Sequence, residues 1–349
     1  MASELDPRKK KILKVITDDY IVSAEPVGSR TIARRYDLGL SPATIRNEMA
    51  DLEEGGYLEQ PHTSAGRIPS DQGYRYYVDA LMSLQQLSEK EIERIHQELD
   101  RHRQQLESII HQTSKLLVQM TRYPSLVLSP HSEDAVFRHI QLVRLSDTAI
   151  LALVVTDSGH VENKVIEFEG GISDAELDRI SLILNEKLRG IRLKDLRSSL
   201  LSEIRSELIA HQDFYNEAIQ LLTRVIGTTG TKERVYIDGA TKILEQPEFS
   251  ELHKFKPLMD ALDEEERLYK LLSENIGGTF VKIGSENKSL GLSGCSIVTA
   301  SYEIAGRTVG VIGVLGPTRM DYAKVLPIVE NTAAILSELL TQMSRRCSK

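Results

Sequence analysis

The feature that most constrains the fold is a short helix whose two ends are both marked in the sequence. Ser41 followed by Pro42 is a strong helix start, because serine caps the first free amides and proline there has no N–H to lose. The pair Gly55-Gly56 supplies a left-handed stop. A single apolar stripe recurs between them, at Ile45, Met49 and Leu52. The sequence therefore predicts an amphipathic helix over residues 42–54.

The residues of this helix that lie off the apolar stripe, near its start, carry methyl, hydroxyl, guanidinium and amide groups. They are Ala43, Thr44, Arg46 and Asn47. Side chains of these kinds read base edges in the major groove of DNA, where arginine suits guanine and asparagine suits adenine. The predicted helix thus has one side for a small core and another side for a DNA groove.

The residues before this helix complete a DNA-binding motif. Ser29–Tyr36 reads as a short helix, and Asp37–Leu40 as a tight turn that contains a glycine. Two helices joined by such a turn make a helix-turn-helix, with residues 42–54 as the recognition helix. A further helix over 7–22, apolar on one side, closes a three-helix core.

A wing is predicted after the two glycines. Tyr57–Gln60 reads as a strand and Arg67–Pro69 as a shorter return strand, joined by the loop PHTSAG. In such a wing Thr63 and Ser64 donate hydrogen bonds to the phosphate backbone, and Arg67 reaches a phosphate or the minor groove. These features predict an N-terminal winged helix-turn-helix.

Charge distinguishes this stretch from the chain as a whole, which carries a formal net charge of -8. That value excludes a protein that coats nucleic acid by charge alone, so any DNA binding is local. Between Ser29 and Asn47 there are four arginines and one aspartate. The acids of the recognition helix fall at its far end, which favours DNA over the alternative, a winged helix that contacts protein. The residues predicted to contact DNA are Arg30, Thr31, Arg34, Ser41, Ala43, Thr44, Arg46, Asn47, His62, Thr63, Ser64 and Arg67.

The stretch LSPATIRNEMADLEEGGYLEQPHTSAGRIPSDQGYRYYVD closely resembles the N-terminal domain of the HrcA family, the heat-inducible transcription repressors of bacterial chaperone operons. Generic winged helices share the first half of this stretch and not the second. The resemblance extends along the chain and includes DGATKILEQPEF and GVIGVLGPTRMDYAKVLPIV. It identifies the chain as similar to HrcA repressors over its whole length.

The resemblance implies a function that the residues alone do not give. It implies a homodimer that represses the class I heat-shock operons, groESL and dnaK/grpE, by binding double-stranded DNA at an inverted-repeat operator named CIRCE. It also implies that the GroEL chaperonin promotes the DNA-binding form. On heat shock, misfolded clients would occupy the chaperonin and the operons would be transcribed.

Helical patterns continue beyond the wing. A helix is predicted to begin at Ser70-Asp71, and apolar residues then recur every three or four positions from Ile92 to Met120, interrupted at His102 and Thr113. We interpret the second pattern as a long amphipathic helix packed on the protein's own sheet. A coiled coil with the same spacing is the alternative.

The middle of the chain predicts an antiparallel meander followed by helices. The expected strands are Phe137–Arg144, Ala149–Thr156 and Val161–Phe168, and the expected helices are Asp174–Leu188, Leu193–His211 and Asp213–Ile226. Short polar turns separate the strands, which is typical of hairpins.

The C-terminal part predicts a second α+β unit. Its expected elements are strand Val235–Ile237, helix Phe255–Glu274, strands Ser296–Ile304 and Thr308–Leu315, and helix Tyr322–Met343. This order resembles a GAF-type sensor domain, and the family resemblance adds that the preceding meander is an inserted dimerisation domain. The expected organisation of this α+β multidomain chain is a winged-helix DNA-binding domain over 1–75, a GAF-like domain over 76–134 and 229–345, and the inserted dimerisation domain over 135–228.

Several function classes are excluded or disfavoured. The longest apolar run, Ala149–Val155, is far shorter than a membrane span, and Asp18 and Asp19 interrupt any signal-like segment, so we expect a cytoplasmic protein without a membrane partner. Only Cys295 and Cys347 are present, and no catalytic, phosphate-binding or metal-ligand pattern occurs. We therefore expect no enzyme and no cofactor. A small-molecule-responsive regulator that uses a pocket in the GAF-like domain remains the alternative function.

Overall fold

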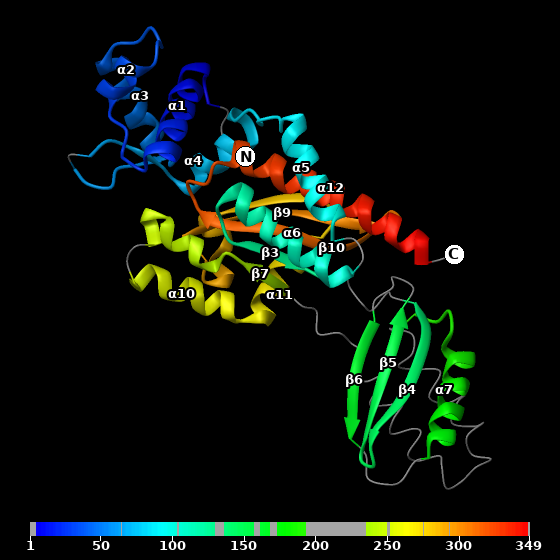
Figure 1. Cartoon of the computed structure of the whole chain (residues 1–349). Helices are drawn as coiled ribbons and strands as arrows, with labels where there is room; N and C mark the ends of the chain where they lie inside the picture. Colours follow the sequence, from blue (N-terminus) through cyan, green and yellow to red (C-terminus); the bar gives the residue numbers. More distant parts are fainter. Residues whose placement is uncertain are drawn as a thin grey trace.

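The computed structural model describes residues 5–63, 65–102, 105–129, 136–156, 161–167, 173–192, 235–249, 252–274, 276–292 and 294–347 of the 349-residue chain. The predicted helices Leu193–His211 and Asp213–Ile226 lie outside the described residues. Figure 1 shows a small helical unit at the N-terminus, a larger layered unit, and a separate sheet flanked by a helix.

The N-terminal unit, residues 5–69, is built from three helices and a short hairpin. The helices are α1 (Pro7–Ser23), α2 (Ser29–Arg35) and α3 (Pro42–Glu54), and the hairpin is β1 (Leu58–Glu59) with β2 (Ile68–Pro69). Their apolar residues form one buried cluster that includes Ile12, Leu13, Ile16, Ile32, Ile45, Leu52 and Leu58. The predicted helix-turn-helix and wing are confirmed as structural elements, and each predicted helix ends within one or two residues of the observed one.

A short helical segment connects this unit to the rest of the molecule. It consists of α4 (Asp71–Tyr76), whose first turn is capped by the Ser70 hydroxyl, and the π-helical turn η1 (Tyr77–Leu81). The helix predicted to begin at Ser70-Asp71 is confirmed, and its second half is wider than an α-helix.

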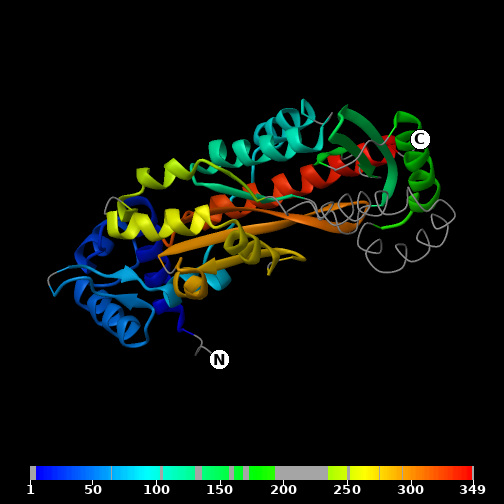
Figure 2. The same cartoon turned by 90° about the horizontal axis from the view of Figure 1, so that it is seen from below.

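The central unit is a five-stranded antiparallel sheet with helices on both faces. The strand order is β7 (Val235–Asp238), β3 (Ser125–Leu128), β10 (Arg307–Pro317), β9 (Cys295–Ile304) and β8 (Thr279–Ile283). One face carries α5 (Glu89–Asp100), α6 (Leu106–Thr121) and α12 (Tyr322–Cys347), and the other carries α10 (Leu252–Asp263) and α11 (Glu265–Ser273). Figure 2 shows α12 running along the sheet, with the N-terminal unit beyond one end of it.

Side-chain alternation along the strands divides the central core into two layers. In β3, Val127 packs under α6 and α12, whereas Leu126 and Leu128 pack under α10 and α11. This is the two-residue period expected of a strand that is covered on both faces. Strands β3 and β8, of four and five residues, were not predicted from the sequence.

Two predicted helices are each two helices. The pattern from Ile92 to Met120 belongs to α5 and α6, which pack against each other and against α12. The predicted single long helix is therefore wrong, although both helices turn the expected apolar stripe towards one core. At the turn, the His102 ring nitrogen lies 3.0 Å from the Ser108 hydroxyl. His102 is a half-buried turn residue.

The predicted helix Phe255–Glu274 is likewise divided, into α10 and α11. Glu264 between them has extended backbone angles, φ -88° and ψ 92°. The acids at 263–266 lie at the end of one helix, where the helix dipole repels negative charge, and at the start of the next, where it attracts it. That charge placement favours a break at this point.

The third sheet has the predicted antiparallel meander. Its strands are β4 (Phe137–Ser146), β5 (Ala149–Thr156) and β6 (Val161–Glu167), in that order, and α7 (Asp174–Leu188) packs against β4. Helix α7 begins with a capping box between Ser173 and Glu176. Among the described helices, none combines the length and the apolar character that crossing a membrane requires.

Candidate nucleic-acid interface

The exposed face of α3 is the centre of the candidate interface. Its buried residues are those predicted, Ile45, Met49 and Leu52. The opposite side exposes Ala43, Arg46, Asn47 and Ala50, which recur about one helical turn apart. Because the two alanines carry only methyl groups, the helix can enter a groove closely while Arg46 and Asn47 project from it. Helices α2 and α3 lie at the outer end of the molecule (Figure 1).

The start of α3 is held by its own cap. The Ser41 hydroxyl accepts a hydrogen bond from the Thr44 amide at 3.1 Å and lies 2.9 Å from the Thr44 hydroxyl, while Pro42 occupies the first turn. The predicted helix start is confirmed. At the other end the left-handed residue is Gly56, with φ of 78°, because Gly55 is still right-handed. Ser41 and Thr44 therefore fix the orientation of the exposed residues that follow them.

The acidic residues near the middle of α3 are paired with helix α1. The Glu48 carboxylate lies 3.2 Å from Arg8 and 4.0 Å from Lys9, and the Asp51 carboxylate lies 3.0 Å from Lys9. The hydrogen bond with Asp51 raises the pKa of the Lys9 ammonium. Helix α1 thus offsets negative charge on α3 that would repel a phosphate backbone.

Three arginines near the recognition helix are exposed and make no ion pair with any described residue. They are Arg30 and Arg34 on α2 and Arg46 on α3, and α2 packs directly on α3. Arg35, by contrast, is paired with Asp19 at 2.8 Å. Thr31 is half-buried beside them. The unpaired guanidinium groups are free to meet phosphates or base edges.

The wing is braced from within. Leu58 pairs with Pro69, and Arg67 makes an additional bridge to Val27. The side-chain amide of Gln60 donates hydrogen bonds to the carbonyls of Thr63 and Ala65, at 3.0 and 3.1 Å. His62 and Thr63 are exposed at the tip, and the predicted contact Ser64 lies outside the described residues. The loop therefore presents its tip in a defined conformation.

Arg67 is not the free arginine that the sequence predicts. Its guanidinium donates to the Glu53 carboxylate, with Nε and Nη distances of 2.8 and 2.7 Å, and its side chain is only 19% exposed. The pair ties the end of α3 to the base of the wing. A contact from Arg67 to DNA requires this ion pair to open.

Three residues that shape this surface were missed by the sequence analysis. Arg8 and Lys9 neutralise acids about 40 positions away, and Gln60 braces the wing. For the first two, the sequence shows a basic run over Arg8–Lys11, but that run does not indicate which acids they face. Nothing in the sequence marked Gln60.

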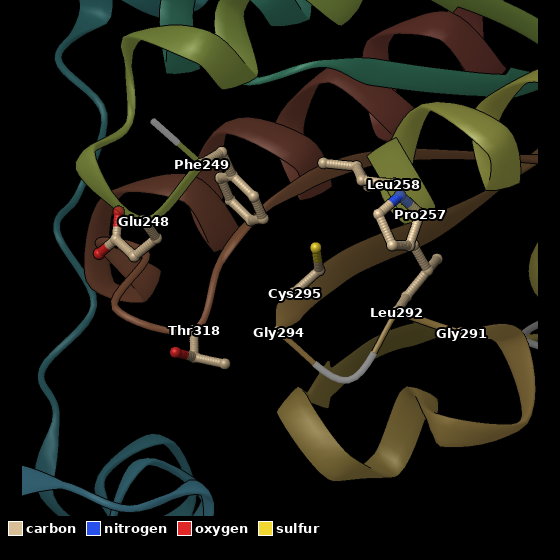
Figure 3. A pocket seen from close by; sticks show the side chains of 9 residues that line it. All are labelled: Glu248, Phe249, Pro257, Leu258, Gly291, Leu292, Gly294, Cys295 and Thr318. Carbon is tan, nitrogen blue, oxygen red and sulfur yellow. The ribbon is translucent and has the colours of Figure 1, made fainter. Parts of the chain in front are cut away.

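A separate hollow lies in the central unit (Figure 3). It encloses about 410 Å³ and is lined by Glu248, Phe249, Pro257, Leu258, Gly291, Leu292, Gly294, Cys295 and Thr318. The sulfur of Cys295 points into it, and burial raises the pKa of this thiol to about 12, so the thiol stays protonated. No cluster of three or more metal-ligating side chains occurs among the described residues. The hollow is mostly apolar, with one carboxylate at its edge.

Comparison with known proteins identifies the family. Residues 107–326 match the family model described as the HrcA protein C terminal domain. The heat-inducible transcription repressor HrcA of Pelotomaculum thermopropionicum is 45% identical over 344 residues, which cover 98% of this chain and 99% of the relative. The protein of the same name from Brevibacillus brevis is 44% identical over 337 residues, covering 97% of this chain and 98% of the relative.

The fold is also similar to one that has been solved. The crystal structure of a hypothetical protein, 24% identical in sequence, aligns with 97% of this chain and 100% of its own, with a TM-score of 0.64. That likeness supports the arrangement of the elements and says nothing of function. The sequence relatives are transcription repressors and not enzymes. On their identity and coverage, the chain belongs to the HrcA family of heat-inducible transcription repressors.

Proposed function

We propose that the exposed face of α3 reads base edges in the major groove of an operator, while α2 and the wing hold the phosphate backbone. The observation that carries this proposal is the sorting of charge on the N-terminal unit. Arg30, Arg34 and Arg46 are exposed and make no ion pair within the described part of the chain, whereas the acids Glu48 and Asp51 are paired with α1. As a heat-inducible repressor of heat-shock chaperone operons, the protein binds DNA, and this face is the one best suited to it.

We assign the remaining partners from the family. The operator is an inverted repeat, each protomer of a homodimer reads one half, and the inserted domain over 135–228 makes the dimer. The GAF-like domain, over 76–134 and 229–345, joins that domain to the winged helix over 1–75. The GroEL chaperonin supports the DNA-binding form in the cytoplasm. Adding the chaperonin to the purified repressor is expected to raise the fraction of repressor that binds operator DNA. A fraction that stays the same would contradict this assignment.

The base-reading role is tested by Arg46→Ala and Asn47→Ala. Each is expected to cost on the order of 1–3 kcal/mol on the operator and little on random DNA, because a lost base contact affects only the correct sequence. A footprint on the organism's own chaperone promoters defines the operator for this measurement. The matched control is Arg101→Ala, which removes an exposed arginine that is paired with Glu98 and lies outside the N-terminal unit. Equal losses on operator and random DNA would argue against base reading.

Heat relief is tested by the state of the dimer. If heat acts on the protein directly, the dimer dissociates within the range of growth temperatures. A single winged helix then binds DNA weakly, because it no longer gains affinity from being joined to a second one. Light scattering at rising temperature measures this. An intact dimer throughout would assign heat sensing to the chaperonin instead.

A second candidate function is control by a small molecule in the central hollow. The observation that favours it is a chain of contacts from the hollow to α1. Glu248, in the wall, accepts hydrogen bonds from Arg319, and Arg319 also donates to the Ile21 carbonyl of α1. A ligand that displaced Glu248 would disturb this contact. A thermal-shift screen with nucleotides and metabolites tests the idea, and a screen without any stabilising compound would reject it.

A further inference from the structure

The N-terminal unit packs directly against the central unit. Tyr20 and Ile21, at the end of α1, pack against the core of the central unit, and Tyr74 of α4 is buried in that same core. The rings of Tyr74 and Tyr322 lie 6.2 Å apart. The two units therefore share an apolar contact, and polar interactions lie at its margin.

Helix α4 and the turn η1 that follows it are held to the N-terminal unit by two hydroxyl hydrogen bonds and by close backbone packing. The Ser70 hydroxyl donates to the Gly56 carbonyl at 2.5 Å, and the Tyr77 hydroxyl donates to Asp18 at 2.6 Å. A Cβ at Gly73 would lie 2.1 Å from the Tyr57 carbonyl oxygen, which only glycine avoids. Helix α4 is therefore fixed to the unit that contains the recognition helix α3.

On its other side α4 is joined to the central unit through Arg75. The guanidinium donates to both carboxylate oxygens of Glu286, at 2.9 and 2.5 Å, and to the Val281 carbonyl at 2.5 Å. The same carboxylate accepts from the Ile283 amide at 2.8 Å. A two-pronged pair of this kind fixes direction as well as distance.

A second tie lies one turn earlier in α4. The Asp71 carboxylate accepts a hydrogen bond from the Ser285 amide at 2.7 Å. The neighbouring Gly284 has φ of 48°, and a Cβ there would lie 2.1 Å from an Asp71 carboxylate oxygen. The tie therefore depends on glycine at this position.

A third tie joins α1 to the segment before α12. Arg319 is 12% exposed and donates to the Ile21 carbonyl at 3.0 Å. It also donates to the Gln246 side chain at 3.2 Å and to the Glu248 carboxylate. The three ties leave the central unit at β8 and η6 (Gly284–Leu290) and at the start of α12, so they resist rotation about more than one axis.

We infer that Arg75, Asp71 and Arg319 are positioning residues that set the operator spacing. They touch no DNA. By fixing α3 relative to the central unit, they fix the separation and angle of the two reading helices in a dimer. A rigid pair accepts one separation of half-sites, whereas a loosely joined pair accepts several at lower affinity. This inference rests on the proposed function, because it assumes that α3 reads half of an inverted repeat.

Two variants and their matched controls test the inference. Glu286→Ala removes the carboxylate partner of Arg75. Its control is Glu274→Ala, which also removes an ion pair, the one with Lys282, but within the central unit. Gly284→Ala places a Cβ against the Asp71 carboxylate and so blocks its hydrogen bond with the Ser285 amide. Its control is Gly306→Ala, because Gly306 also has a positive φ, of 79°, but a Cβ there meets no atom within 4 Å. The controls reproduce the lost charge and the backbone strain without touching the N-terminal unit.

The readout is affinity for a single half-site and for inverted repeats whose spacer is lengthened or shortened by single base pairs. The wild type and both controls are expected to show one sharp optimum. The two test variants are expected to lose about tenfold at that optimum and to flatten the profile, with unchanged half-site affinity. An unchanged profile would overturn the inference. A wild type that binds a half-site as tightly as a full repeat would instead overturn the proposed function.

A measurement without DNA keeps the inference testable if a variant binds too weakly. Nitroxide labels at Ala50→Cys on α3 and Ala334→Cys on α12, with Cys347 replaced by serine, report the distance between the units in protein diluted with unlabelled chain. Pulsed electron paramagnetic resonance is expected to give one narrow distance distribution in the labelled protein without further substitutions. Glu286→Ala is expected to broaden this distribution, and Glu274→Ala is not. An equally narrow distribution in Glu286→Ala would overturn the inference.

Discussion

Three exposed arginines on and beside the recognition helix differ from the two at the boundary with the central unit. Arg30, Arg34 and Arg46 are exposed and unpaired among the described residues, whereas Arg75 and Arg319 are each bound to a carboxylate and a backbone carbonyl. The residue type is the same in both places. Pairing, rather than composition, therefore separates arginines that can meet DNA from those that hold the recognition helix in place.

Removing the more buried of the two boundary arginines, Arg319, is expected to change stability most. Arg319→Ala leaves Glu248 and the Ile21 carbonyl without their partner, and we expect it to destabilise the fold by about 3 kcal/mol, because half of a largely buried pair is left unpaired. Denaturant unfolding measures this. Arg46→Ala is the comparison and is expected to stay within about 0.5 kcal/mol of the wild type, since it is exposed. Equal stability of the two variants would remove the distinction between the two regions.

A smaller effect is expected on DNA from an unpaired arginine of α2. Arg34→Ala is expected to weaken binding to operator and random DNA alike, and to reduce the slope of log K against log salt by about 0.9, as for one lost phosphate contact. A salt titration with both DNAs measures this. Arg35→Ala, which removes an arginine already paired with Asp19, is expected to change the slope less. If the two variants shifted the slope equally, pairing would not decide which arginine meets phosphate.

The contribution of the Arg75–Glu286 ion pair to stability is expected to depend on pH. Burial raises the pKa of Glu286, but the hydrogen bonds from Arg75 and the Ile283 amide outweigh it, so this pKa lies below its ordinary value of 4.5. A carboxyl whose folded pKa is depressed stabilises the fold fully above its unfolded pKa and loses that contribution as the pH falls through the folded value. Stability measured from pH 6 to pH 3 is therefore expected to fall less steeply in Glu286→Gln than in the wild type. Parallel curves would show that the tie does not contribute.

The sequence predicted the elements of the N-terminal unit well because each has a local signal. Ser41-Pro42 marks a helix start by chemistry within one turn, and the apolar stripe repeats within two turns. The division of α5 from α6 was missed because the spacing of apolar residues continues across the turn. A pattern of spacing cannot distinguish one helix from two that pack on the same core.

The candidate site was only partly predictable for a related reason. Arg46 and Asn47 were found because helical periodicity places them opposite the buried stripe. The ion pair that engages Arg67 was not found, because Glu53 lies 14 positions away and belongs to another element. Pairing between distant elements is set by tertiary packing, and it is this pairing that assigns each arginine its role.

The smallest expected effect concerns a hydroxyl at the centre of the boundary between the units. The Tyr74 hydroxyl is buried and has no hydrogen-bond partner among the described residues, and burial raises its pKa well above 10. Tyr74→Phe keeps the ring packed beside Tyr322 and removes an unsatisfied polar group, so stability is expected to stay unchanged or to rise slightly. Thermal unfolding measures this, and the spacing preference on DNA is expected to match the wild type. Tyr74→Phe keeps both the apolar contact and the polar ties, so a changed spacing profile would show that the Tyr74 hydroxyl, and not only the ties at the margin, sets the orientation.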